Sequence, residues 1–214
     1  MKTYYRVLEV LLSEIQDNLD KKIGLMLSDF YEYGQSKIEY IAKCLSYLKC
    51  EFPYLSKEYE DYIVKYHCTI LGEYDLLNLC EDDPEIMDDL IIQDFQNTKT
   101  EFPTLLPIGN INGEDYIYLN EKGEVIQFTG IGSEHPPKDF FTEVPDDEYE
   151  MGFNIAYLTY PDKEGLYRMY AVIARSFDEF MNDFVCGPRY PELTDKEDNY
   201  YYEIMKIRKE LGID

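Results

Sequence analysis

The sequence has no tryptophan, only two histidines, and fewer than half as many basic residues as acidic ones. There are 20 lysines and arginines against 44 aspartates and glutamates, which gives a formal net charge of −24 over 214 residues. Nucleic acids and anionic membranes are bound through basic surfaces, so this charge argues against both as direct partners. It fits a basic protein partner instead. Hydrophobic residues still make up 45% of the chain, too many for a disordered acidic tail.

Long apolar runs and paired cysteines are also missing. Glu9 and Glu14 interrupt the apolar stretch from Val7 to Ile15, so the first twenty residues hold no apolar core of the signal-peptide type. No stretch approaches the roughly 20 apolar residues of a membrane-spanning helix. The five cysteines form no CxxC pair, as a zinc site would need. We therefore expect a cytoplasmic protein with reduced, mostly buried thiols, no metal and no cofactor.

The acidity is concentrated in the middle of the chain. Residues 51–152 hold 25 acids and 5 bases, a net charge of −20, whereas residues 1–50 are neutral and residues 153–214 carry −4. Such a run is either a solvated surface that keeps the protein soluble or a negative field that attracts a basic partner. The second interpretation makes ten carboxylates candidates for partner binding. They are Glu81, Asp82, Asp83, Glu85, Asp88, Asp89, Asp115, Asp146, Asp147 and Glu148.

Helical spacing of apolar residues dominates the first hundred positions. Helices are expected over residues 3–19 and 25–33, from a capping box of Ser36 and Glu39 to Phe52-Pro53, and from Ser56 to about Tyr66. Residues 80–104 are interpreted as an acidic insertion with a helix that begins at Asp83-Pro84.

Strand patterns follow, and then helices again. Strands are expected at residues 105–108, 116–119, 125–128, 155–160 and 166–173, with hairpin turns at 120–123 and 161–165 and a loop at 130–137. Ser176 with Glu179 and Thr194 with Glu197 form capping boxes that begin the last two helices, and Gly187-Pro188 ends the first of them. The final helix has acids first and bases last, which matches the helix dipole.

Strand pairs bracketed by segregated helices indicate an α+β fold, mainly an antiparallel sheet with helices packed against it. The domain prediction is a helical extension at residues 1–50, packed on the core, and an α+β domain at residues 51–214. The acidic insertion at about 80–104 and the final helix belong to that domain.

Catalytic motifs are scarce. The chain has no GxSxG, no HExxH and no phosphate-binding loop. Gly130-Ile131-Gly132 begins a GxGxxG pattern, but His135 replaces the last glycine and prolines follow instead of a helix. His67-Cys68 is best interpreted as a structural pair, because adjacent residues point in different directions. Loop carboxylates such as Asp115 or Glu134 leave a hydrolase open, but the expectation is a protein that is not an enzyme.

Four segments, in order along the chain, resemble the SUKH superfamily. They are Phe52-Pro53-Tyr54-Leu55 with the helix after it, Leu105-Leu106-Pro107-Ile108-Gly109 followed by Gly113 to Leu119, Gly123-Glu124-Val125, and Ile173 to Met181. Together they span about residues 52–186. The chain departs from the family pattern at Ile70-Leu71-Gly72, where a glycine pair is usual, and in the acidic segment 80–104. Residues 1–50 and the last helix lie outside the resemblance.

The resemblance implies a non-catalytic binder. SUKH proteins are small bacterial immunity proteins, related to fungal cell-wall-assembly regulators, that neutralise toxins, many of them nucleases. The expected partner is therefore a basic cognate toxin, bound by the acidic runs. A regulatory scaffold unrelated to toxins is the main alternative, and a hydrolase using loop carboxylates is a weaker one.

Overall fold

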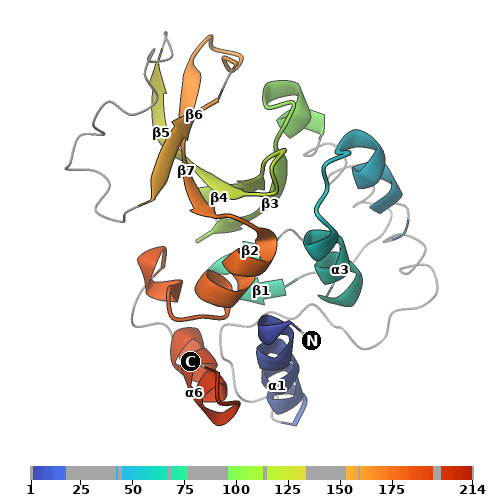
Figure 1. The fold of residues 1–214 in the computed structure, drawn as a ribbon, viewed down its shortest axis with the longest axis vertical. Coiled ribbons are helices and arrows are strands. Elements are labelled where there is room, and N and C mark those ends of the chain that lie inside the picture. Colours follow the sequence, from blue (N-terminus) through green and yellow to red (C-terminus); the bar gives the residue numbers. More distant parts are fainter. Residues whose placement is uncertain are drawn as a thin grey trace.

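A computed structural model of the chain describes residues 2–17, 42, 45–66, 69–76, 96–112, 115–133, 153–158, 160–194 and 199–213. Within these residues helices pack against an antiparallel sheet, most of them on one of its faces (Figure 1), which confirms the predicted α+β class. The part of the chain that is described holds no helix of the length and apolarity needed to cross a membrane.

The described strands form one sheet of seven strands, in the order β1-β2-β3-β4-β5-β7-β6, and every neighbouring pair is antiparallel. Their bounds are β1 Thr69–Leu71, β2 Tyr74–Leu76, β3 Leu106–Ile111, β4 Asp115–Leu119, β5 Val125–Ser133, β6 Asn154–Tyr157 and β7 Tyr167–Ala174. The predicted hairpins β4–β5 and β6–β7 are both present. The β1–β2 hairpin was not predicted, because each of its strands has only three residues.

The expected loop at residues 130–137 is wrong for its first four positions. β5 continues through Ser133, and after a register shift Gly132 pairs with Arg168 and Ser133 with Tyr167 of β7. Two glycines within four residues do not favour a strand by themselves. Hydrogen bonding to the neighbouring strand therefore overrides the local preference here.

The described helices are α1 Thr3–Asp17, residues 45–51, α3 Lys57–Tyr66, residues 96–101, α5 Phe177–Glu179 and α6 Asn199–Glu210. Ser56 caps α3 as expected, since its Oγ accepts a hydrogen bond from the Tyr59 amide at 3.2 Å. The helix ended by Phe52-Pro53 stops at residue 51, as predicted. Two expected helices, at residues 25–33 and after Asp83-Pro84, lie outside the described residues. The same is true of the capping residues Ser36, Glu39 and Glu197.

The segment after β7 departs from a simple α-helix. Ser176 Oγ accepts the Glu179 amide at 3.1 Å, as the capping box predicts, but the Glu179 carboxylate bonds the Arg175 amide instead of that of Ser176. α5 then widens into the π-helix η1 (Phe180–Val185), after which the Cys186 amide bonds the Met181 carbonyl. A short 3₁₀-helix, η2 (Tyr190–Glu192), follows.

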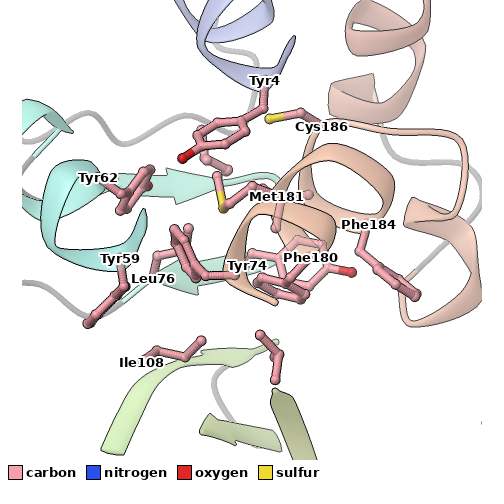
Figure 2. Packing of buried hydrophobic residues seen from close by; sticks show 14 of the residues in the cluster. Tyr4, Tyr59, Tyr62, Tyr74, Leu76, Ile108, Phe180, Met181, Phe184 and Cys186 are labelled. Atoms are coloured by element: carbon pink, nitrogen blue, oxygen red, sulfur yellow. The ribbon is translucent and has the colours of Figure 1, made fainter. Parts of the chain in front are cut away.

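The main core lies between the sheet and these helices (Figure 2), and aromatic rings fill much of it. Tyr59 and Tyr62 of α3 pack edge-on to Phe177, with ring centroids 5.0 and 5.2 Å apart. The hydroxyl of buried Tyr190 accepts a hydrogen bond from the Glu73 amide at 2.9 Å, which ties η2 to the β1–β2 turn. Many of the chain's 22 tyrosines are therefore core residues.

The first helix belongs to the same core. Tyr4, Val7, Leu8 and Leu11 of α1 are fully buried, and α1 lies beside α6 (Figure 1). The Asn182 side chain of η1 accepts the Tyr4 amide at 2.8 Å and so caps the start of α1.

Candidate partner-binding face

The sheet has two differently covered faces, and the second face is the candidate site. Side chains alternate along a strand, so Ile117 and Leu119 of β4 enter the main core while Tyr118 points to the other side. There Tyr118 joins a second, smaller cluster with Leu105, Ile126 and Leu158. We call this side the aromatic face, and it comprises Phe102, Tyr116, Tyr118, Phe128, Tyr160 and Tyr170.

Three of its rings form a compact group. The Phe102 and Phe128 centroids lie 4.8 Å apart, those of Tyr118 and Phe128 lie 5.3 Å apart, and Phe102 meets Tyr118 edge-on at 6.3 Å. Tyr116, two residues before Tyr118 on the same strand, shares its side of the sheet and is 58% exposed. Aromatic residues are enriched at protein interfaces relative to the rest of the surface.

Two tight turns border this face, and a side chain organises each of them. Asn120 Oδ1 accepts the amides of Lys122 and Glu124, while Gly123 takes the left-handed conformation with φ of 78°. At the other turn, buried Asp162 accepts the amides of Glu164 and Leu166, and Gly165 has φ of 80°.

Asp162 also pairs with Arg168. Burial opposes ionisation of this carboxyl, but the hydrogen bond from the Leu166 amide and the contacts with Arg168 together lower its pKa. The turn is therefore held by an ionised carboxylate.

The helix at residues 96–101 borders the aromatic face, and its side chains form ion pairs with two other segments of the chain. Lys99 pairs with Glu51 of the helix at 45–51. Glu101 pairs with Lys163 of the β6–β7 turn at 3.0 Å, and Thr104 Oγ1 lies 3.0 Å from the Tyr160 hydroxyl. These contacts join the helix to a hairpin about sixty positions later in the chain.

Two hollows open on this face. One, of about 240 Å³, lies between the helix at 96–101 and β4 and is lined by Asn97, Thr98, Glu101, Phe102, Pro107, Tyr116 and Tyr118. A smaller one, of about 130 Å³, is lined on its polar side by Asn120, Glu121 and Lys122 and on its apolar side by Leu105, Ile126 and Leu158. Thr104, Tyr160 and Tyr170 complete its lining.

Carboxylates lie near the tyrosines of both hollows. Burial, together with the nearby Tyr116 and the charge of Glu101, raises the pKa of Tyr118 to about 12. Burial, and next the charge of Glu124, raises the pKa of Tyr170. Both tyrosines therefore stay neutral hydroxyls at physiological pH, and the carboxylates beside them favour a cationic ligand.

Of the ten predicted carboxylates, the structure places one. Asp115 begins β4, is exposed, and stands next to Tyr116. The other nine, Glu81, Asp82, Asp83, Glu85, Asp88, Asp89, Asp146, Asp147 and Glu148, lie outside the described residues. The prediction that these groups bind a partner stays a prediction.

The aromatic face was missed by the sequence analysis. Its signal is the alternation of rings at Tyr116 and Tyr118, with Phe128 and Tyr170 on later strands. The chain has 22 tyrosines, and this count does not say which of them lie on a binding surface.

The Cys, Asp and Glu side chains in the described part of the chain form no group of three that could hold a metal ion. Ser133 ends β5, whereas His67, Cys68, Glu134 and His135 fall outside the residues described. Of the two described cysteines, Cys186 is buried and Cys50 is exposed.

Comparison of the chain with protein-family models, curated proteins and solved structures finds no match in any of the three.

Proposed function

We propose that the protein is a non-catalytic acidic binding protein of the bacterial cytoplasm, an immunity protein of SUKH type that neutralises a basic toxin. The observation that carries the proposal is the net charge of −20 over residues 51–152, which include the helix at 96–101 and strands β1 to β5. A field of this size speeds the capture of a basic protein and suppresses binding to acidic ones.

The chain's own cations offset only part of this charge, because 44 acidic residues stand against 20 basic ones. Most described lysines and arginines already pair with a carboxylate, as Lys2 does with Asp178 and Lys65 with Glu9. Arg208 is buried and donates to the carbonyls of Asn182 and Cys186. The remaining negative charge is therefore available to a partner.

A nuclease toxin suits this surface chemically. An enzyme that holds phosphates needs basic residues around its active site. An acidic protein that covers those residues competes with the nucleic acid for the same charges. Inhibition then requires binding alone and no reaction by the inhibitor.

The test is capture of the partner from the lysate of the source cell. Tagged protein is incubated with lysate at low and at high salt, and bound proteins are identified by mass spectrometry. We expect one basic protein with toxic activity, held at low salt and weakened at high salt, because exposed charges are screened beyond about 10 Å at 0.1 M salt. Co-expression should then protect cells from that protein.

Two charge-reversal variants locate the contact. One changes Asp82, Asp83, Asp88 and Asp89 to lysine, and the other changes Asp146, Asp147 and Glu148. Loss of capture by either variant supports binding through that run. Unchanged capture by both contradicts the role of the acidic runs, and a salt-insensitive housekeeping complex contradicts the immunity function.

A further inference from the structure

The larger hollow on the aromatic face already has a cation of this chain at its edge. Lys163 Nζ lies 3.0 Å from Glu101 Oε2, although the Lys163 side chain is 70% exposed and comes from a distant turn. Glu101 also lines the hollow, together with Phe102, Tyr116 and Tyr118. The position next to Glu101 therefore combines one carboxylate with several aromatic rings and already accepts a positive group.

We propose that this hollow receives an arginine side chain of the basic partner, which takes the place of Lys163 on Glu101. The inference rests on the proposed function, because it names where on the surface the basic partner is held. Lys163 acts as an intramolecular competitor for the same carboxylate.

Charge and shape both favour a guanidinium as the occupant. A planar guanidinium stacks on aromatic rings and forms two parallel hydrogen bonds with a carboxylate, which an ammonium does not. Tyr116 offers an exposed ring, and Glu101 offers the carboxylate. An exposed lysine–carboxylate pair is weak, so exchanging Lys163 for a better-fitting cation loses little.

Competition for Glu101 predicts opposite effects on arginine binding when Glu101 or Lys163 is replaced by a neutral residue. Removing the Glu101 charge removes the acceptor and should weaken binding of an arginine. Removing the Lys163 charge frees the acceptor and should strengthen it. An acidic surface without a specific site predicts only small changes, equal to those caused by the same charge change elsewhere.

The experiment measures binding of a fluorescein-labelled hexa-arginine peptide to the full chain by fluorescence anisotropy. Each variant is compared with a control that has the same change on α6. Glu101→Gln is matched by Glu210→Gln and Lys163→Gln by Lys209→Gln, both controls being exposed positions.

We expect Glu101→Gln to weaken binding about five- to tenfold more than its control, because a charge-assisted contact is lost. Lys163→Gln should strengthen binding about two- to fivefold relative to its own control, the range of exposed ion pairs. Damage to the fold would move both variants in the same direction, so the opposite signs of the two results separate a binding effect from misfolding.

A third pair tests the aromatic part of the site. Tyr116 and Tyr202 are exposed to nearly the same extent, 58% and 59%, so Tyr202→Ala on α6 is the control for Tyr116→Ala. Tyr116→Ala should weaken peptide binding about two- to fivefold more than Tyr202→Ala, because a cation–π contact is removed.

The proposal is overturned if Glu101→Gln is no weaker than Glu210→Gln, or if Lys163→Gln is no stronger than Lys209→Gln. The capture experiment fails or succeeds independently. If a toxin is captured and Glu101→Gln does not change its binding, the proposed arginine site is wrong and the immunity function stands. If the three variants change peptide binding as expected relative to their controls but no basic protein is captured, the arginine site stands and the immunity function is wrong.

Discussion

Replacing Gly187 with alanine should be among the most destabilising single changes in the chain. Gly187 follows η1, and a Cβ there would lie 2.1 Å from the Asn182 carbonyl oxygen and 2.5 Å from that of Asp183. Neither oxygen is free to move away, because Arg208 donates to the first at 3.2 Å and the Arg189 amide donates to the second at 2.8 Å. The turn itself must therefore shift by about 1 Å.

The magnitude follows from what such a shift breaks. Two hydrogen bonds contribute about 1 kcal/mol each, and overpacking adds about 1–3 kcal/mol. We expect the free energy of unfolding to fall by about 3–5 kcal/mol, measured by urea titration with circular dichroism at an unchanged m-value.

Gly212→Ala is the control for this prediction. Gly212 has φ of 63° with nothing within 4 Å of an added Cβ, so only the backbone strain of about 1–2 kcal/mol applies. If Gly187→Ala is destabilised no more than Gly212→Ala, the close approach between η1 and the following turn does not exist in solution, and the reasoning fails.

Three further predictions concern single groups. Ser176→Ala should lower the free energy of unfolding by about 1 kcal/mol in the same titration, because α5 loses its N-cap, and an unchanged midpoint would contradict that cap. In the folded protein, iodoacetamide should label Cys50 but not Cys186, whose pKa burial raises to about 12, as read by peptide mass mapping. The Asp162 carboxyl has a lower pKa in the folded protein than in the unfolded chain. Its ionised form therefore stabilises the fold at pH values above the unfolded pKa, and this stabilisation is lost as pH falls through the lower folded pKa. Asp162→Asn, which also weakens the contact with Arg168, should therefore be less stable than the parent at pH 7, and the difference should shrink as pH falls below the pKa of the unfolded carboxyl, whereas a pH-independent difference would refute this.

Local sequence signals predicted the elements that depend on neighbouring residues. The Ser56 and Ser176 caps, the stop at Phe52-Pro53 and the two hairpin turns are present because each is made within a few residues of chain. Periodicity also placed α1 correctly through Asp17, since a helix with one apolar stripe must bury that stripe.

Elements that depend on distant residues could not be predicted in this way. β1 and β2 are too short to carry a pattern, and residues 130–133 join β5 only because β7 provides their partners. The widening of α5 into η1 likewise depends on its surroundings, with buried Arg208 of α6 donating to the carbonyls of Asn182 in η1 and of Cys186 just after it.

The sequence by itself determined the class of the fold, the negative charge and its concentration over residues 51–152, because composition and short-range spacing do not depend on where the chain travels. Only the tertiary structure decided which side chains share each face of the sheet and which groups meet there. Glu101 meets Lys163, and Phe102 meets Phe128, across long sequence separations. Such contacts arise from strand order and from the alternation of side chains across the sheet, which no local segment contains.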